Sequence, residues 1–429
     1  MTVLETMPNA CELQSSAPLK IALLGYRSAP HVGGQGIYLK YLSESLVNLG
    51  HRVDVISGPP YPELDPRVKL IKLPSLDLFA AKSHPILELR PKHLLSFTDF
   101  YEWWSMATGG FAEPYTFSRR VVKYLESRVS DYDIVHDNQC LGYGLLTIQA
   151  RGLPTVATVH HPISRDRQLA LDAAPNWWHR LLVRRWHSFL GMQGKVVRNL
   201  KHIITVSEQS RRDIAEAFYR PVEKIDLIHN GIDTRTFCPQ PHIARKPYRL
   251  MTTASADQPL KGLKYLLEAI GSLQKRYPDI TLLVVGKLKR GGQTEKQLRQ
   301  LGIENRVTFV SGISTERMVE YYAETELAVS PSLYEGFGLP VGEAMACGVP
   351  VVACDGGALP EVVGDAGLVV KAADSGALAA AIRQLLDSQE LRDQLATRGR
   401  KRILKLFSWN VAARQMTRFY HQVLERENH

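Results

Sequence analysis

The feature that most limits the fold of this chain is an alternation of short apolar runs with helical repeats, which occurs twice along the sequence. In the first half, apolar runs at 20–25, 53–56, 133–136 and 155–159 are interspersed with loops and helical segments, the first of which is a helical repeat at 37–49. This order is typical of parallel strands covered by helices. The sequence therefore predicts an α/β domain in the first half.

The same alternation restarts after a turn signal at His229–Gly231 and a polar, proline-containing segment at 239–247. The second pattern predicts strands at 249–253, 281–285, 307–310, 327–330 and 349–353, and helices at 262–276, 314–324 and 341–346. A chain of 429 residues also exceeds what one hydrophobic core usually organises. We therefore expect a loose tail at 1–17, domains at 18–228 and 229–407, and a C-terminal segment, 408–429, whose amphipathic helix returns to the first domain.

Composition and charge limit the partners and the compartment. Five cysteines are scattered without a Cys-x-x-Cys pair, and no uncharged apolar stretch reaches the ~18 residues that span a bilayer. Since the N-terminal segment also lacks the pattern of a secretory signal, we expect a cytoplasmic protein, with attachment to the inner membrane face left open. The net charge of +10 favours nucleotide phosphates or acidic lipids as partners. Nucleic acid is not expected, because no nucleic-acid-binding module is recognisable.

The strongest functional signal is the segment Pro331–Gly348, with the sequence PSLYEGFGLPVGEAMACG. It places a glycine loop between a predicted strand end and a predicted helix. Gly336 and Gly338 allow backbone N–H groups to approach a phosphate or sugar oxygen, towards which the start of the helix directs a positive dipole. Glu335 and Glu343 would accept hydrogen bonds from sugar hydroxyls. The alternative is a helix cap with two solvated glutamates.

Three further segments carry candidate groups. Lys261 precedes a predicted helix, where a lysine can neutralise a diphosphate or simply be solvated. Gly33 and Gly34 lie in the first strand-to-helix loop, whose spacing does not fit a dinucleotide-binding motif. Polar side chains also follow two first-domain strands: Asp137, Asn138 and His160. Asp137 and Asn138 would orient an acceptor, whereas an isolated histidine such as His160 is more often a packing or capping residue.

Taken together, these motifs resemble the signature of the family 4 retaining glycosyltransferases of the GT-B fold. The match includes the two glutamates separated by seven residues in 331–348, the pair Lys261–Gly262, and landmarks at 205–208 and 228–233. The resemblance covers about residues 20–407. It implies an α/β chain with two Rossmann-like domains facing across a cleft, and transfer of a hexose-type sugar from a UDP- or GDP-sugar to an acceptor hydroxyl.

The resemblance also implies roles for individual residues. Lys261, Glu335 and His160 would form the catalytic group, in which Lys261 contacts the diphosphate, Glu335 the donor sugar, and His160 that sugar from the first domain. Glu343 would hold the ribose. The remaining donor contacts would come from Gly33, Gly34, Ser255, Gly336, Phe337, Gly338 and Leu339.

One position departs from the family pattern. An arginine normally lies six residues before the lysine, and this chain has Ser255 there. Three interpretations stay open: Ser255 donates a weaker hydrogen bond, Lys287 or Arg290 replaces the arginine, or donor affinity is reduced. The departure also motivates a rival function, a nucleotide-sugar-binding protein without transfer activity. An epimerase or a phosphorylase on the same fold is a second rival.

We expect the acceptor to be a small molecule, a glycan or a lipid. The sequence gives the weakest indication of which residues bind it. Apolar Trp178, Leu182, Trp186 and Phe189 recur at helical spacing among arginines and lysines in 177–201. This pattern fits either a helix on an anionic membrane or a helix whose apolar face covers the sheet. Since the Asp-x-Asp pair 131–133 precedes a strand and reads as a solvated loop, we expect no metal and no cofactor besides the donor.

Overall fold

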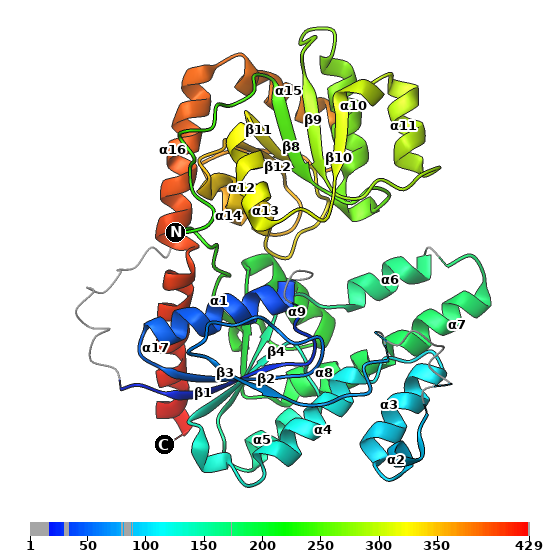
Figure 1. Ribbon diagram of the computed structural model, residues 1–429, viewed down its shortest axis with the longest axis vertical. Coiled ribbons are helices and arrows are strands. Elements are labelled where there is room, and N and C mark those ends of the chain that lie inside the picture. The colour runs from blue at the N-terminus through cyan, green and yellow to red at the C-terminus, as the bar shows by residue number, and fades with distance from the viewer. Residues whose placement is uncertain are drawn as a thin grey trace. The chain divides into compact units, whose positions relative to one another are not determined.

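The computed structural model describes residues 17–29, 34–78, 80, 87, 89–172 and 174–427. These residues form two compact units, each with its own sheet and helices (Figure 1). Unit 1 comprises the described chain up to Val206, Arg211–Ile228 and the chain from Ala412, and unit 2 comprises Ser207–Ser210 and His229–Val411. The expected α/β architecture with two Rossmann-like sheets is confirmed.

In the described part of unit 1, seven parallel strands form one sheet in the order β3-β2-β1-β4-β5-β6-β7. The bounds are β1 Lys20–Gly25, β2 Arg52–Ser57, β3 Lys69–Lys72, β4 Ile134–Asn138, β5 Thr155–Val159, β6 His202–Thr205 and β7 Asp226–Leu227. The central strands β4 and β5 are buried along their whole length. Buried parallel strands read as continuous apolar runs, which is why these strands stand out in the sequence.

Helices cover this sheet and extend beyond it. They are α1 Gly34–Asn48, α2 Pro91–Leu94, α3 Phe97–Ala107, α4 Glu113–Leu125, α5 Gly144–Ala150, α6 Ser164–Asp172, α7 Trp177–Trp186, α8 Leu190–Asn199, α9 Glu208–Phe218 and α17 Trp409–Glu427. From Ala412 on, α17 belongs to unit 1 and buries Met416, Tyr420 and Val423 at helical spacing. The Tyr420 hydroxyl lies 2.5 Å from Nδ1 of the buried His136. This contact fixes the helix to the centre of the sheet.

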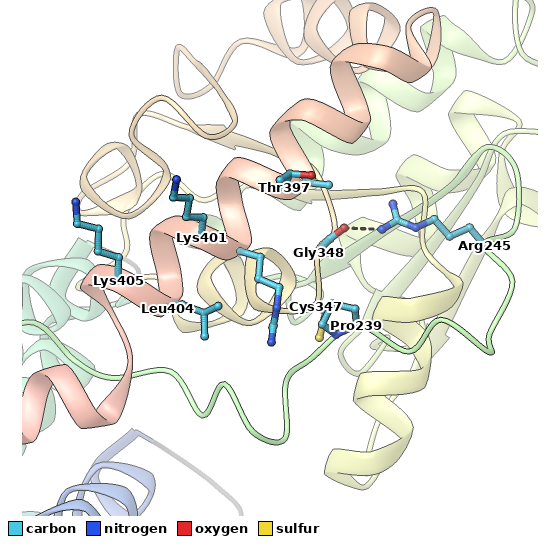
Figure 2. Close-up of a pocket in the computed structure, with 10 residues that line it drawn as sticks. Pro239, Arg245, Cys347, Gly348, Thr397, Lys401, Leu404 and Lys405 are labelled. Carbon is cyan, nitrogen blue, oxygen red and sulfur yellow. Dashed lines mark hydrogen bonds between the residues drawn. The ribbon is translucent and has the colours of Figure 1, made fainter.

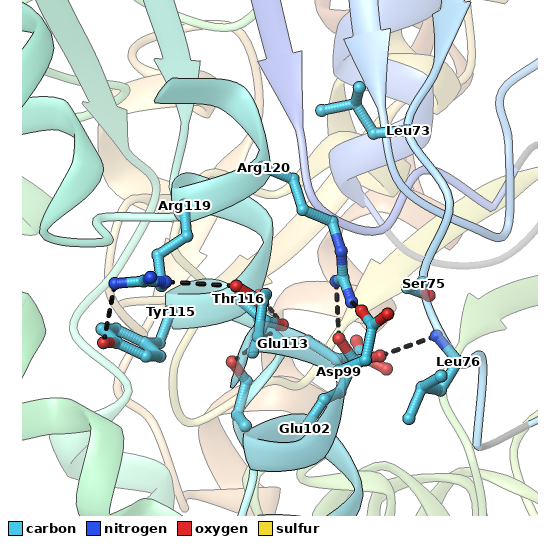
Figure 3. A network of polar contacts seen from close by, with 12 residues as sticks. Leu73, Ser75, Leu76, Asp99, Glu102, Glu113, Tyr115, Thr116, Arg119 and Arg120 are labelled. Carbon is cyan, nitrogen blue, oxygen red and sulfur yellow. Dashed lines mark hydrogen bonds and ion pairs between the residues drawn. The ribbon is translucent and has the colours of Figure 1, made fainter. Parts of the chain in front are cut away.

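A charged network joins α3 to α4 (Figure 3). Arg120 of α4 donates to Asp99 at 2.6 Å and to Glu102 at 2.5 Å, both on α3. The other Glu102 oxygen accepts from the backbone N–H of Leu76 at 2.9 Å. Glu102 is buried, and each of its carboxylate oxygens accepts a hydrogen bond from one of these partners. It therefore holds α3 in place without an uncompensated charge.

The basic aromatic segment does not form one helix along the sheet. It divides at a 3-10 turn, His187–Phe189, into α7 and α8. Helix α8 buries six of its residues, whereas α7 buries none, and Trp177 and Trp178 are 74% and 52% exposed. The interpretation as a sheet-covering helix is thus right for α8 and wrong for α7. No described helix combines the length and apolar character needed to cross a bilayer.

In unit 2, the described residues form six parallel strands in the order β10-β9-β8-β11-β12-β13. The bounds are β8 Arg249–Thr253, β9 Thr281–Val285, β10 Val307–Val310, β11 Leu327–Ser330, β12 Val351–Cys354 and β13 Leu368–Val370. The helices are α10 Leu263–Leu273, α11 Gln293–Leu301, α12 Thr315–Glu324, α13 Leu339–Ala346, α14 Leu359–Val363, α15 Ser375–Leu386 and α16 Gln389–Leu406. Helix α13 begins two residues before the predicted start, with Gly338 as its N-cap.

Candidate active site

The loops after two neighbouring central strands of unit 2, β8 and β11, meet at the carboxyl edge of the sheet. The backbone N–H of Leu333 donates to the carbonyl of Leu260 at 2.8 Å and ties the loops together. A Cβ at Gly262 would lie 1.9 Å from the Pro331 carbonyl oxygen, and this residue has a φ of +62°. Only glycine satisfies both conditions, so the Lys261–Gly262 pair is also a structural requirement of the junction.

The junction brings together the two charged residues that the sequence singled out. Lys261 Nζ donates to Glu335 Oε1 at 2.8 Å, and the Ser332 hydroxyl donates to the same oxygen at 2.8 Å. The backbone carbonyl of Glu335 accepts from Ala358 N–H at 2.9 Å. Both charged side chains keep part of their surface exposed, so they can reach a bound ligand. A positioned cation and a positioned carboxylate therefore lie side by side at the strand ends.

Backbone amides form a cradle next to this pair. The N–H groups of residues 336–339 have no acceptor in the described part of the chain. Gly338 has a φ of +97°, which turns the chain into α13, and the carbonyl of Gly336 is anchored by the Ser207 hydroxyl at 2.7 Å. Unpaired amides at a helix N-terminus are an anion site. The Phe337 side chain is buried against Phe407, so only its backbone is available to a ligand.

Glu343 lies one turn inside α13. The Tyr322 hydroxyl donates to Glu343 Oε2 at 3.3 Å and to the Pro340 carbonyl at 3.1 Å. Burial raises the pKa of Glu343 to about 7, against the lowering effect of the Tyr322 hydrogen bond. A carboxyl group that titrates near neutrality and is positioned by a tyrosine accepts hydrogen bonds from a diol in its ionised form.

Ser255 and Lys287 follow adjacent parallel strands at the same sheet edge. Thr253 of β8 is paired with Val285 of β9, and each of the two residues lies two positions beyond its strand's paired residue. The chains approach closely there, because a Cβ at Gly286 would lie 2.1 Å from the Ala254 carbonyl oxygen. Lys287 and Arg290 are both exposed. The register thus places Lys287 nearer to the Ser255 position than Arg290, which is three residues further along the loop.

In unit 1, the carboxyl ends of β4 and β5 hold the predicted polar residues. His160 Nε2 lies 2.7 Å from Asn138 Oδ1, and Asn138 Nδ2 donates to the Gln35 carbonyl at 3.0 Å. Since Asn138 uses its amide as a donor to Gln35, its oxygen accepts from His160, which then carries its proton on Nε2. The His160 backbone N–H donates to Gln139 Oε1 at 2.7 Å. The ring is thereby fixed with Nδ1 as its acceptor nitrogen.

Burial at this edge of the sheet keeps the His160 ring neutral. Burial lowers the pKa of His160 to about 3, with a smaller contribution from His161. His160 therefore acts as a neutral hydrogen-bonding group at pH 7 and not as a proton-carrying acid.

Asp137 is completely buried, and burial raises the pKa of its carboxyl to about 7. It accepts from Leu141 N–H at 3.0 Å and so shapes the loop after β4. Asp137 and Asn138 are both buried in this structure, and their role as acceptor ligands stays a prediction. Gly34 is the exposed first residue of α1, and Gly33 lies outside the described residues.

Several residues that position the site were not predicted from the sequence. Ser332, Tyr322 and Gln139 each fix a predicted side chain or its backbone through contacts that only the fold reveals. Of these, Ser332 had a local signal, because it lies three residues before Glu335.

Comparison with known proteins covers nearly the whole chain. Residues 32–236 match the family described as "Glycosyltransferase Family 4", and residues 235–402 match "Glycosyl transferases group 1". The MMP α-(1→4)-mannosyltransferase of Mycolicibacterium hassiacum is 46% identical over 412 residues, which cover 95% of this chain and 99% of that protein. The phosphatidyl-myo-inositol mannosyltransferase of Mycolicibacterium smegmatis is 27% identical, over 91% of this chain and 90% of that protein.

Solved structures agree on the architecture. The sucrose-phosphate synthase of Thermosynechococcus elongatus has a TM-score of 0.67 at 25% identity and covers 95% of this chain and 100% of that one. The Anabaena protein HepE in complex with UDP-glucose has a TM-score of 0.67 at 18% identity, covering 94% and 100%. The two Rossmann-like sheets, the strand-end site and these similarities lead to one conclusion: the chain belongs to the family 4 glycosyltransferases of the GT-B fold and is a glycosyltransferase.

Proposed function

We propose that this enzyme is a retaining mannosyltransferase that moves mannose from a nucleotide diphosphate sugar to an acceptor hydroxyl and forms an α-(1→4) linkage. The observation that carries the proposal is the Lys261–Glu335 pair, 2.8 Å apart, beside the unpaired amides of residues 336–339. A diphosphate and a sugar require this combination of a cation, N–H donors and a carboxylate. The choice of mannose and of the linkage is supported by the name of the 46% identical relative.

Different residues of unit 2 would bind different parts of the donor. Lys261 donates to the diphosphate, the amides of residues 336–339 bind phosphate and sugar oxygens, and Glu335 accepts from sugar hydroxyls. Glu343 holds the ribose diol. We assign the role of the missing arginine to Lys287, because its strand register places it at the Ser255 edge.

Transfer would proceed on one face of the sugar. The bond between the anomeric carbon and the phosphate oxygen breaks, and its electron pair leaves with the nucleotide diphosphate. The acceptor oxygen forms its bond to the same face of that carbon, and the acceptor proton passes to the departing phosphate oxygen. Lys261 and the N-terminus of α13 stabilise the charge that develops on the leaving group. Because these groups supply positive charge, we propose that the reaction needs neither a metal ion nor a cofactor.

His160 would serve as a hydrogen-bond acceptor for a substrate hydroxyl through Nδ1. Its neutral state and its fixed orientation support this role. Asn138 and Gln139 act as positioning residues, because they orient the ring and its backbone.

The rival functions predict other behaviour. An epimerase would convert the donor without an acceptor, a phosphorylase would need phosphate, and a non-catalytic sensor would bind the donor without releasing nucleotide. The named relatives, which are transferases and a synthase, favour transfer over these alternatives.

We also propose that α7 contacts an anionic membrane surface and that the enzyme works in the cytoplasm. Trp177, Trp178 and Leu181 are exposed, and Arg180 and Arg184 lie on the same helix. Exposed tryptophans beside arginines suit the interface of an acidic bilayer. Co-sedimentation with phosphatidylglycerol vesicles, but not with phosphatidylcholine vesicles, is expected, and Trp177→Ser with Trp178→Ser should abolish it. Equal binding to both kinds of vesicle would contradict the proposal.

The function is tested by incubating the purified enzyme with GDP-mannose or UDP-mannose, or with UDP-glucose as the control donor, and a mannoside acceptor, with and without EDTA. We expect GDP or UDP release that depends on the acceptor and persists in EDTA, and an α-(1→4) product by NMR. Glu335→Gln should lower kcat by about 100-fold or more. The control is Glu304→Gln, which changes an exposed glutamate paired with Arg299. Donor binding without release under any condition would contradict the proposal.

A further inference from the structure

A cavity lies in unit 2 against α16 and the C-terminal end of α13, apart from the strand-end site (Figure 2). Its volume is about 670 Å³, within the range of small-molecule sites. Four cations line it, Arg245, Arg400, Lys401 and Lys405, and no carboxylate is among its lining residues. Its remaining surface is largely apolar and includes Pro239 and Leu404. The cavity thus offers positive charge next to apolar surface.

The end of α13 explains why two of these cations are there. Gly348 has a φ of +70°, its N–H donates to the Met345 carbonyl at 3.0 Å, and the Val349 N–H donates to the Ala344 carbonyl at 2.9 Å. These two bonds are a Schellman motif, which satisfies part of the helix's terminal carbonyls. The Ala346 and Gly348 carbonyls accept instead from Arg400 and Arg245. Both arginines therefore stabilise the negative end of α13.

The other two cations are not used by the protein. Lys401 and Lys405 lie one turn apart on α16, are exposed, and have no ion-pair partner among the described residues. The negative charges of Asp393 and Glu326 favour the charged form of Arg245, but neither carboxylate lines the cavity. Glu326 is itself paired with Arg392 at 3.0 Å. The positive charge of the cavity is thus left for a ligand.

We propose that this cavity binds a free small molecule that carries a phosphate group on an apolar body, and that its binding weakens the binding of the nucleotide sugar. The lysines and the ends of the arginines would contact the phosphate, and the surface near Pro239 and Leu404 would cover the apolar part. The second half of the proposal rests on the function proposed for the strand-end site. The first half does not.

The route of coupling is α13 itself. An anion in the cavity competes with the Ala346 and Gly348 carbonyls for Arg400 and Arg245. The same helix carries Glu343 and begins at Gly338, in the amide cradle. Weaker contacts at its C-terminal end would loosen the helix that holds the donor. A ligand that stabilises one arrangement of this helix must change donor affinity to the extent that the two arrangements differ in affinity for it.

The probe is octyl phosphate below its micelle concentration, titrated into the full-length protein by calorimetry, with octanol and inorganic phosphate as the half-ligands. We expect octyl phosphate to bind more tightly than either half-ligand. Lys401→Ala with Lys405→Ala should weaken that binding by about ten-fold or more. The control is Lys289→Ala with Lys296→Ala, which removes two lysines of unit 2 outside the cavity. Unchanged binding in the cavity variant, or equal loss in the control, would overturn the site.

The coupling is measured separately, as the Kd of the nucleotide diphosphate with and without saturating octyl phosphate. A rise of about five-fold is expected in the wild type and no rise in Lys401→Ala with Lys405→Ala. Octyl phosphate that binds without changing this Kd overturns the regulation, whereas absence of nucleotide binding in all samples overturns the proposed function. A further experiment measures binding of the wild type and the cavity variant to phosphatidic acid vesicles. If the cavity variant loses vesicle binding and monomeric octyl phosphate does not bind, the proposal of a free ligand is wrong.

Discussion

At the scale of single residues, Lys261 is the group on which the chemistry depends most. Its ammonium is the positioned cation beside the amide cradle, where the leaving diphosphate gains charge. Lys261→Met should lower kcat by about 100- to 1,000-fold, since a positioned donor at developing charge has that effect. The unfolding temperature should change little, because the side chain is partly exposed. Steady-state kinetics measure the effect, and a loss of less than three-fold would show that the lysine is only solvated.

The replacement of an arginine by Ser255 gives a second residue-scale prediction. If Lys287 supplies the missing charge, Lys287→Ala should raise KM for the donor by about ten-fold, the effect of losing one charge-assisted hydrogen bond. Arg290→Ala is the matched control from the same loop and should change KM by less than two-fold. Ser255→Arg in the Lys287→Ala background should restore affinity. Equal effects of the two alanine variants would reject this assignment.

The structure brings together the two charged residues that the sequence singled out, and it buries one of the predicted polar residues. Glu335 and Lys261 belong to local motifs, and the predicted loops meet in unit 2 as parallel strand ends must. Asp137 also follows a predicted strand, as a ligand-binding residue would. The fold nevertheless buries it, because positive φ values at Gln139 and Leu141 turn the loop back over it. Such loop geometry depends on non-local contacts and leaves no periodic trace in the sequence.

At the scale of elements, the junction of the two site loops depends on a glycine that cannot be replaced. Gly262→Ala places a methyl group 1.9 Å from the Pro331 carbonyl oxygen at a φ of +62°. Either the loop of Lys261 or that of Glu335 must then move, so activity and stability should both fall, with stability reduced by at least about 2 kcal/mol.

The control for this variant is Gly302→Ala at the end of α11. Gly302 has a φ of +64°, but a Cβ there would meet nothing within 4 Å. In this variant the free energy of unfolding should fall by only about 1 kcal/mol, from backbone strain at the positive φ, and activity should be unchanged. Thermal unfolding and kcat/KM measured side by side separate steric displacement from backbone strain, and equal losses in the two variants would show that the junction does not depend on the close approach.

The elements themselves were predicted unevenly. The strands of residues 20–25, 155–159, 249–253 and 281–285 have the predicted bounds, and the helix predicted in the segment 408–429 spans Trp409–Glu427. Sequence periodicity did not identify α15, α16 or the edge strands β3 and β13. The edge strands are short and only partly buried, so their apolar signal is weak. In α16 a large basic and polar share hides the few buried positions, Leu395, Gly399 and Ile403.

At the scale of the whole molecule, burial sets opposing pH dependences of stability. Burial lowers the pKa of His136 and His160 to about 3, so the unfolded chain, in which histidine titrates near 6.5, binds more protons as pH falls below that value. These histidines therefore contribute stability that is present above pH 6.5 and is lost on acidification. Burial raises the pKa of Asp137 and Glu113 to about 7, so these carboxyls favour the folded state below pH 4 and cost stability as pH rises towards 7. The wild-type profile mixes both effects.

A variant of His136 separates the two effects. Both ring nitrogens are engaged, by the Tyr420 hydroxyl at 2.5 Å and by the Thr158 hydroxyl at 2.7 Å, and the group is almost fully buried. His136→Gln keeps a donor and an acceptor but cannot take up a proton. Between pH 7 and pH 5 the wild type should lose up to about 2 kcal/mol more of its free energy of unfolding than the variant, because the carboxyl contributions are common to both. Urea unfolding at the two pH values measures this difference. Parallel pH profiles would mean that His136 is protonated in the folded state, and the contact of α17 with the sheet would then have to be an ion–dipole contact instead of a neutral hydrogen bond.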